Sequence, residues 1–132
     1  MASEIHGGPV SKPAFLAGWV LTVLLSLFLL MGVVFTFAQP EKAAEGMVKA
    51  GYPKHTMLPI MIVELICVLL YLLPRTAVLG AVLLTGYLGG AVATHVRIDE
   101  WQFVIAVAVG VVVWLSLYLR DRRVRALLPM RR

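Results

Sequence analysis

Four long apolar runs constrain this chain more than any other feature. They predict membrane-spanning helices over about residues 14–37, 57–73, 76–95 and 102–119, because a hydrocarbon core of roughly 30 Å takes about 20 residues of helix to cross. Hydrophobic residues make up 61% of the 132, which is well above the share found in soluble domains. We therefore predict an all-α fold, an integral membrane four-helix bundle that forms a single transmembrane domain over residues 1–132.

The first run could also be interpreted as a secretory signal, since Thr36-Phe37-Ala38 weakly resembles a cleavage site. However, the run is longer than the apolar core of a cleavable signal, which has about 7–15 residues. We expect this segment to be retained as the first helix.

An even number of spans puts both ends of the chain on the same side of the membrane. Eight basic residues fall on that side: Lys12, Arg75, Arg120, Arg122, Arg123, Arg125, Arg131 and Arg132. Four fall on the other side: Lys42, Lys49, Lys54 and Arg97. The positive-inside rule then predicts that the N- and C-termini are cytoplasmic.

Residues 120–132 form an Arg-rich tail directly after the last predicted span. Basic residues in that place are typical of topology signals and of contact with anionic lipid head groups. A nucleic-acid-binding arm would be accompanied by a recognisable binding module, and the sequence shows none. We therefore expect a cytoplasmic tail close to lipid and no nucleic-acid partner.

The chain has a single cysteine, Cys67, inside the second run. One cysteine forms no intrachain disulfide and no CxxC redox motif. A thiol in apolar surroundings usually behaves as a small hydrophobic side chain. Any dithiol chemistry would therefore have to come from a partner protein.

Two short connections are clearly marked in the sequence. Residues 41–50 are rich in helix formers, and Gly51 is of the type that commonly ends a helix. We predict a short helix there, lying at the membrane interface. Pro74 and Arg75 leave almost no linker between the second and third runs, so these two helices should form a tight antiparallel hairpin.

The third run is rich in small residues. Gly86 and Gly90 are four residues apart, as are Gly89 and Ala93. Such small-xxx-small pairs let two helix backbones approach closely in lipid. We predict close helix packing on these residues, either within the bundle or against a second copy of the chain.

Glu64 is the charged residue within the otherwise apolar second run. A carboxyl group inside a membrane span is costly, so it usually faces a bundle interior, a partner or water. Helices rise 1.5 Å per residue, so reflecting the hairpin about its turn puts Glu64 level with Thr85 and Gly86, with the Tyr87 hydroxyl in reach. Residues spaced by three and four form one face of this helix: Met57, Ile60, Met61, Glu64, Cys67 and Tyr71.

Polar residues at the far end of the hairpin suggest a funnel with Glu64 at depth. His55 and His95 fall at similar heights, roughly 15 Å from Glu64 along the helices. The candidate ligand-binding residues are Glu64, Thr85, Tyr87, Gly90, Thr94, His95 and Arg97. The candidate catalytic residues among them are Glu64, Tyr87 and His95.

A metal site is not expected, since Glu64 and the two histidines lack the spacing of three or four convergent ligands. A purely structural role is the alternative for this acid. In that case Glu64 would hydrogen-bond Tyr87 and hold the hairpin in register, and the histidines would be ordinary interfacial residues.

Several segments resemble the DoxX-like family of small four-helix bacterial membrane proteins. They are Gly51-Tyr52-Pro53, Glu64, Pro74-Arg75-Thr76-Ala77, Leu84 to Ala91, and His95-Val96-Arg97. The resemblance covers about residues 15–119 and implies a multi-pass protein of the bacterial inner membrane. Matching positions are Glu64, Gly86, Gly89, Gly90, His95 and Arg97, without assigned roles. The resemblance also implies possible links to thiosulfate:quinone oxidation or to thiol-redox and oxidative-stress complexes.

The leading hypothesis is an outward-opening intramembrane cavity that binds a quinone, a lipid or another apolar small molecule. Quinone is the candidate cofactor, and the protein would then be the membrane subunit of a complex with a redox partner. Glu64 and Tyr87 would orient the ligand or exchange a proton with it, while His95 and Arg97 would hold its polar end.

Two other functions stay open. The first is a non-enzymatic scaffold or assembly factor that docks partners through the Gly-rich third helix. The second is an enzyme, an isoprenoid isomerase that uses Glu64 as an acid. A homo-oligomer is compatible with each of these hypotheses.

Overall fold

A computed structural model describes residues 9–130, and every regular element within them is a helix. The four long helices are α1 (Lys12–Ala38), α3 (Met57–Leu72), α4 (Ala77–Arg97) and α5 (Phe103–Arg120). The shorter ones are α2 (Pro40–Lys49), the 3-10 turn η2 (Lys54–Thr56) and α6 (Arg122–Leu127). The predicted all-α four-helix bundle is confirmed. Arg131 and Arg132 of the predicted tail lie outside the described residues.

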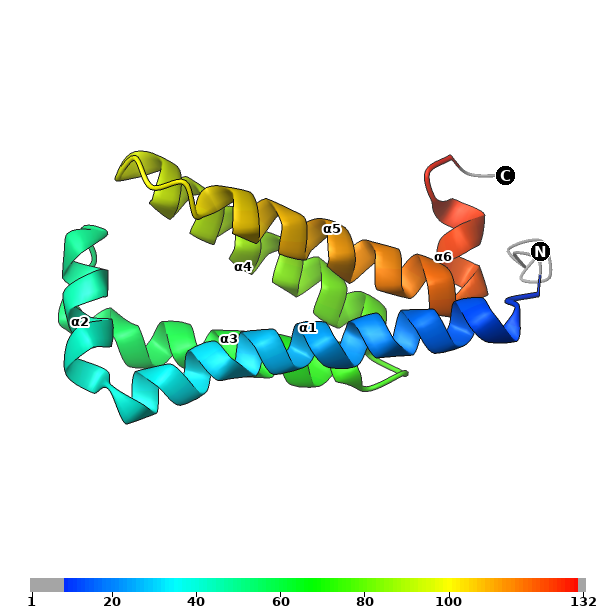
Figure 1. The fold of residues 1–132 in the computed structure, drawn as a ribbon, viewed down its shortest axis with the longest axis horizontal. Helices are drawn as coiled ribbons and strands as arrows, with labels where there is room; N and C mark the ends of the chain where they lie inside the picture. The colour runs from blue at the N-terminus through cyan, green and yellow to red at the C-terminus, as the bar shows by residue number, and fades with distance from the viewer. Residues whose placement is uncertain (1–8, 131–132) are drawn as a thin grey trace.

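The long helices form a ring of neighbours in which α1 contacts α3 and α5, and α4 contacts α3 and α5. Figure 1 shows α1 beside α3 in one layer and α4 beside α5 in the other. The layers lie close together at the end that carries both chain termini and the α3–α4 turn, and they separate toward α2 (Figure 1). We call these the terminal end and the α2 end.

Two glycines explain the close approach of the layers at the terminal end. A Cβ atom added to Gly80 of α4 would overlap the backbone of Tyr71 and Leu70 in α3. A Cβ atom added to Gly18 of α1 would lie 2.7 Å from the Ser116 carbonyl oxygen in α5. Only glycine allows the two pairs of helices to pack at these distances.

The predicted packing on the glycines of α4 within the bundle is wrong. A Cβ atom added to Gly86, Gly89 or Gly90 would meet no atom within 4 Å. The physical reason for Gly86 and Gly90 is the divergence of the layers, which leaves these residues facing the space between them. Gly89 faces outward, toward a groove between α4 and α5. The close contact is made instead by Gly80, which lies nearer to the α3–α4 turn than the other three glycines.

The core of the bundle lies mostly in the half nearer the terminal end. Its fully buried members include Val68, Tyr71, Ala81, Leu84 and Val113. The hydroxyl of Tyr71 is hydrogen-bonded to the hydroxyl of Ser116 and also donates to the Val113 carbonyl at 3.1 Å. These bonds satisfy the buried hydroxyl groups of Tyr71 and Ser116 between α3 and α5.

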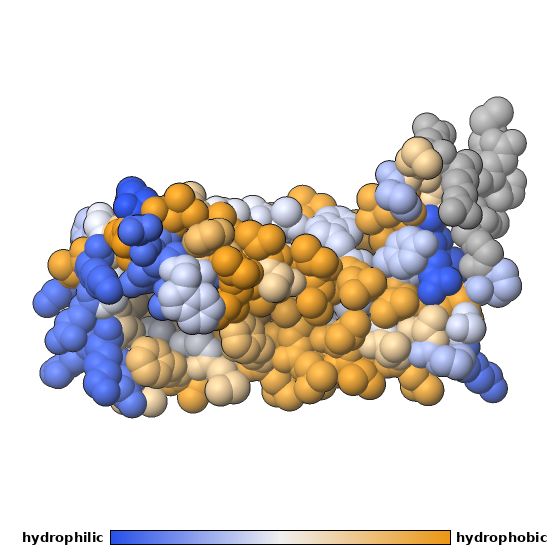
Figure 2. Space-filling model, turned by 45° about the horizontal axis from the view of Figure 1, so that its top comes forward, coloured by the Kyte–Doolittle hydropathy of each residue, from blue (hydrophilic) through white to orange (hydrophobic). Residues whose placement is uncertain are grey.

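The face of the bundle seen in Figure 2 is apolar between two polar ends, as the orange band shows. The helices α1, α4 and α5, and α3 taken together with η2 (Lys54–Leu72), are long and apolar enough to cross a membrane. Large exposed apolar side chains such as Leu24, Met31 and Val111 point outward from this band. In lipid such a surface is solvated, whereas in water it would drive aggregation.

The predicted short helix before Gly51 is confirmed as α2, and its end has the geometry of a Schellman motif. Gly51 has a φ of +88°, a left-handed conformation that favours glycine. The Gly51 amide donates to the Val48 carbonyl at 3.0 Å and the Tyr52 amide donates to the Met47 carbonyl at 2.9 Å. These bonds satisfy the last carbonyls of α2 and turn the chain into α3.

Candidate functional site

A cavity of about 620 Å³ lies between the layers at the α2 end. Its walls come from the end of α1, from α2, and from the facing sides of α3 and α4. The apolar part of the lining is Phe35, Ala43, Met47, Ala50, Met57, Ile60, Met61, Ala91 and Ile98, together with Gly46, Gly86 and Gly90. The polar part is Thr36, Lys42, Lys49, Tyr52, Glu64, Tyr87, Thr94, His95 and Glu100. We call this volume the α2-end cavity.

Glu64 and Tyr87 form a polar pair in this cavity. The Tyr87 hydroxyl donates a hydrogen bond of 3.1 Å to Oε2 of Glu64. The other carboxylate oxygen, Oε1, lies toward α1, where a Cβ atom on Gly32 would be 3.6 Å away. The contact predicted from the hairpin is therefore confirmed, and the acid faces the interior of the bundle, away from the apolar outer surface.

The predicted face of α3 divides into two parts with different surroundings. Met57, Ile60 and Met61 line the cavity together with Glu64. One and two turns further on, Cys67 and Tyr71 are buried in the core. The change occurs because α3 and α4 are close together near their turn and further apart at the α2 end.

Two polar residues of α4, Thr94 and His95, line the cavity on the side of Tyr87 that is nearer the α2 end. Thr94 donates to the Gly90 carbonyl at 2.8 Å and shares a second hydrogen bond of 2.8 Å with the Tyr52 hydroxyl. His95 also lines the cavity, one position further along α4. Of the residues proposed from the sequence, the structure thus brings five to this volume: Glu64, Tyr87, Gly90, Thr94 and His95.

Thr85 and Arg97 are not brought to the cavity. Thr85 donates to the Ala81 carbonyl at 2.7 Å and accepts from Nε1 of Trp114 at 2.9 Å. It lies in a separate groove on the outer side of α4 and α5, which Gly89 also lines. Thr85 is two residues from Tyr87, a rotation of about 200° around the helix, so the two side chains face different sides.

The side chain of Arg97 reaches from the end of α4 to the end of α2. Its guanidinium donates to the Ala50 carbonyl and lies 5.5 Å from the centre of the Tyr52 ring. His55 is exposed in the 3-10 turn and does not line the cavity. Of the three residues predicted at the rim of the funnel, His95 therefore lines the cavity, and His55 and Arg97 contribute nothing to its walls.

Glu100 connects the end of α4 with α2. Its Oε1 accepts from Nζ of Lys49 at 2.8 Å, and its Oε2 lies 3.0 Å from Nδ1 of His95. Together with the bond from Arg97 to Ala50, these contacts hold the C-terminal ends of α2 and α4 side by side. We call Lys49, His95, Arg97 and Glu100 the α2 latch. Cations suit this place, because helix C-termini carry partial negative charge.

The hydrogen bond from Lys49, and to a smaller extent the one from His95, lowers the pKa of Glu100 below its ordinary value. A carboxyl group whose pKa is lowered by folding stabilises the folded state at pH values above its ordinary pKa. This stabilisation is lost as the pH falls through the lowered pKa. The titratable groups in contact with Glu100 are Lys49 from α2 and His95 from α4. The latch is therefore expected to weaken in acid.

Glu100→Gln should loosen α2 at neutral pH, because the replacement removes the charge that binds Lys49. We expect faster amide hydrogen exchange over residues 40–50 in the variant than in the parent protein. The difference should shrink as the pH falls below the carboxyl range, where the parent also loses this charge. Glu45→Gln is the matched control, since Glu45 is exposed on the same helix. Equal exchange in parent and Glu100→Gln at neutral pH would contradict a role for the latch.

Sequence reasoning missed the contribution of α2 and the segments around it to this site. Lys42, Met47, Lys49 and Tyr52 all line the cavity, although only the helix itself was predicted. The sequence did contain a signal for Tyr52, because this residue lies between the helix-ending Gly51 and Pro53. Glycine and proline favour a turn, and a turn at this point directs the Tyr52 ring back toward the hairpin. Glu100 was missed because the ion pair joins residues 51 positions apart.

The α2-end cavity is large enough for an organic ligand. Among residues 9–130, no group of three His, Cys, Asp or Glu side chains lies close enough together to hold a metal ion. The carboxyl group of Glu64 and the phenol of Tyr87 are in contact deep in the cavity. Hydroxyl, imidazole and charged groups line the part of the cavity near α2. Chemically it can accept and donate hydrogen bonds to a ligand that is otherwise apolar.

A model of the DoxX-like family matches residues 20–117, which is most of the chain. The chain belongs to the DoxX-like family. The match spans all four long helices and includes Glu64 and Tyr87. With its four apolar helices, this DoxX-like protein is a multi-pass membrane protein. Comparisons of the DoxX-like chain with curated proteins and with solved structures found no match.

Proposed function

We propose that this protein binds a small apolar or amphipathic molecule, such as a quinone or a lipid, in the α2-end cavity. The observation that carries the proposal is the hydrogen-bonded pair of Tyr87 and Glu64, 3.1 Å apart, on the wall of a cavity of about 620 Å³. A carboxyl group kept away from water inside a membrane span is usually retained for a function.

The size and lining of the cavity support a ligand of this kind. Small-molecule sites usually have volumes of about 300–1,000 Å³, with mostly apolar walls and a few convergent polar groups. Met57, Ile60, Met61 and Ala91 supply apolar contacts around the polar pair. Thr94 and His95 lie nearer α2, so an elongated ligand could have polar contacts at both ends.

A quinone fits this distribution of groups well. Its carbonyl oxygens accept hydrogen bonds, which Tyr87 or a protonated Glu64 can donate. Reduction of a quinone takes up protons together with electrons, and an acid in contact with the ligand can deliver a proton. The electrons would come from a membrane redox partner, so the protein would serve as the membrane subunit of a redox complex.

The orientation follows from the charge distribution of the chain. We propose that the terminal end faces the cytoplasm of a bacterial cell, because most basic residues of the loops and tail lie there. The α2 end, with its cavity, would then face the outer side of the inner membrane. A ligand dissolved in the bilayer would enter between the separated layers.

Glu64→Gln is the first test, because it keeps the shape of the side chain and removes its charge and its acidity. We expect the affinity for a short-chain quinone to fall about tenfold, as is typical when a hydrogen bond to a charged group is lost. Tyr87→Phe should have a similar effect, and Tyr118→Phe, outside the cavity lining, should have none. Native mass spectrometry of the purified protein measures bound quinone and identifies any co-purifying molecule.

Two results would count against the proposal. If Glu64→Gln binds the quinone, and phosphatidylcholine offered as a second probe, as the parent does, then Glu64 is not part of a binding site. If both Glu64→Gln and Tyr87→Phe lower the melting temperature with no ligand bound to the parent, the pair only holds the hairpin in register.

The alternative function, a scaffold that docks another membrane protein through α4, now depends on one glycine of this helix. Gly86 and Gly90 line the α2-end cavity, while Gly89 lies in the outer groove with Leu88, Val92, Gly110 and Trp114. Docking of another membrane helix through α4 would therefore depend on Gly89. A partner complex that is lost in Gly89→Leu and kept in Gly90→Leu would favour the scaffold over the binding site.

A further inference from the structure

A second pocket lies at the terminal end, on the opposite end of the bundle from the α2-end cavity. It has a volume of about 530 Å³ and is lined by the segment before α1, the first turns of α1, the α3–α4 turn and the junction of α5 with α6. Its lining residues are Pro9, Val10, Phe15, Trp19, Pro74, Ala77, Arg120, Asp121, Arg122 and Arg123. Three of them are arginines and one is acidic.

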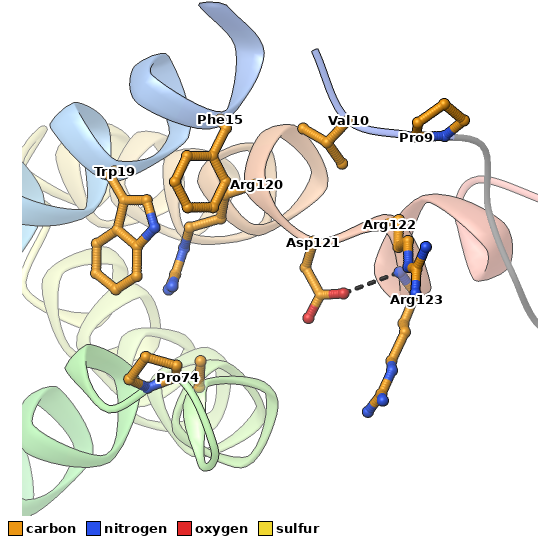
Figure 3. Close-up of a pocket in the computed structure, with 10 residues that line it drawn as sticks. Pro9, Val10, Phe15, Trp19, Pro74, Arg120, Asp121, Arg122 and Arg123 are labelled. Atoms are coloured by element: carbon orange, nitrogen blue, oxygen red, sulfur yellow. Dashed lines mark hydrogen bonds between the residues drawn. The ribbon is translucent and has the colours of Figure 1, made fainter. Parts of the chain in front are cut away.

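Arg120 is the central residue of this pocket. Figure 3 shows its side chain reaching from α5 into the space between Trp19 and Pro74. Its guanidinium carbon lies 4.3 Å from the centre of the Trp19 ring, and one of its terminal nitrogens donates to the Tyr71 carbonyl at 3.4 Å. Only 9% of the residue is exposed, so this cation is held firmly in place.

The charge of Arg120 has no acidic partner among residues 9–130, where the ion pairs involve Lys49, His95 and Glu100. Its Nε atom is buried and lacks a hydrogen-bond partner within the described chain. The neighbouring Asp121 instead accepts from the Arg123 amide at 2.8 Å and caps α6 (Figure 3). A largely buried cation without an acidic partner is costly. Because Arg120 lines the pocket, this points to an anion from outside the chain that would contact the terminal nitrogens of the guanidinium.

The donor groups and charge of this pocket match a phosphate group. A guanidinium presents its donors in a planar fork that fits two phosphate oxygens. Arg123 and Arg122 lie on the other side of the pocket and add positive charge. Basic pockets between membrane helices are known to take the head groups of anionic lipids.

The position along the helices identifies the source of the phosphate. Arg120 is the last residue of α5, and α1 has 27 residues, so α1 is roughly 40 Å long and exceeds the hydrocarbon core by several ångströms at its ends. The pocket therefore lies at head-group depth. Phe15, 45% exposed, and Trp19 form its apolar side, where the glycerol and first acyl carbons of a lipid would lie.

We propose that the terminal-end pocket binds the phosphate of an anionic phospholipid, with Arg120 as the main contact and Arg123 as a second one. This site is separate from the α2-end cavity and does not depend on the function proposed for it. The lipid would fill the space between α1, the α3–α4 turn and α5, and would tie these elements together at the tightly packed end of the bundle.

The test is a lipid titration of the full chain in detergent, followed by native mass spectrometry, with phosphatidylglycerol and phosphatidylcholine as the two probes. The parent protein should bind phosphatidylglycerol more tightly than phosphatidylcholine. Arg120→Gln should reduce this preference about tenfold, since it removes charged hydrogen bonds to phosphate, and Arg123→Gln should reduce it by a smaller factor. The matched control is Arg75→Gln, which removes an exposed charge at the same end outside the pocket lining.

Each of the other outcomes overturns the proposal. Equal binding of the two lipids by the parent means that there is no anionic lipid site. An equal loss in Arg75→Gln and Arg123→Gln means that general surface charge is responsible. Binding of inorganic phosphate in a third titration, without a preference between the lipids, means a site for free anions. If Arg120→Gln does not fold, the comparison of Arg123→Gln with Arg75→Gln decides the question.

Discussion

Gly80→Ala is expected to destabilise the bundle by about 1–3 kcal/mol, the usual cost of adding a methyl group to a well-packed interior. The added Cβ atom would overlap the backbone of Tyr71 and Leu70. Backbone atoms in a helix cannot rotate out of the way as a side-chain end can, so α3 and α4 would have to move apart. Thermal unfolding of the purified protein in detergent should show a clearly lower melting temperature.

Gly89→Ala is the matched control and should act in the opposite direction. No atom lies within 4 Å of a Cβ atom at Gly89, and alanine is favoured over glycine within a helix by about 1 kcal/mol. A melting temperature that is unchanged or higher is therefore expected. If Gly80→Ala were as stable as Gly89→Ala, the close approach of α3 and α4 at the terminal end would be disproved.

Gly90→Leu should abolish ligand binding in the α2-end cavity while the protein still folds. The leucine side chain has room, because nothing lies within 4 Å of a Cβ atom at this position. It would project into the cavity that Gly90 lines and occupy the volume of the proposed ligand. We expect at least a hundredfold loss of affinity for the quinone, as an overlap of several atoms cannot be relieved by small shifts.

Gly89→Leu separates this effect from a general change in α4. The two glycines are adjacent, but Gly89 lines the outer groove and Gly90 lines the cavity. Quinone titrations and melting temperatures of both variants should therefore show a loss of binding in Gly90→Leu alone. Normal binding by a folded Gly90→Leu would exclude the α2-end cavity as the ligand site.

The two ends of the bundle have different physical characters, and each suits its proposed role. At the terminal end, Gly18 and Gly80 bring helix backbones into near contact, which makes this end stiff. At the α2 end the layers are apart, and the α2 latch joins α2 to α4 through charged side chains. Ion pairs of partly exposed charges contribute little stability, so α2 is held less firmly than the closely packed helices, and the proposed ligand would enter between the separated layers.

The sequence predicted the elements of the fold well and the neighbours of Glu64 in part. The apolar runs and the Pro74–Arg75 turn led to the α3–α4 hairpin, and the rise of the helix led to the contact between Glu64 and Tyr87. Depth along a helix follows from counting residues, and for this reason it could be predicted from the sequence. The prediction used depth alone and not the rotation of about 100° per residue, so Thr85 was assigned to the wrong side.

The glycines of α4 show a second limit of the sequence. Gly80, Gly86, Gly89 and Gly90 are the same residue in the same kind of apolar run. Gly80 contacts a backbone, Gly86 and Gly90 line a cavity, and Gly89 lies in an outer groove. A small residue permits close packing but does not cause it, because the partner helix has to be there.

The sequence by itself determined that this protein has four helices long and apolar enough to cross a membrane, joined in a fixed order by short turns. This is a local property, since the length and polarity of each segment decide whether it is stable in lipid. The tertiary structure alone decided where the helices separate, that α2 and Tyr52 complete the cavity, and that Arg120 is buried without an acidic partner among the described residues. These features depend on contacts between residues far apart in the chain, which no single segment contains.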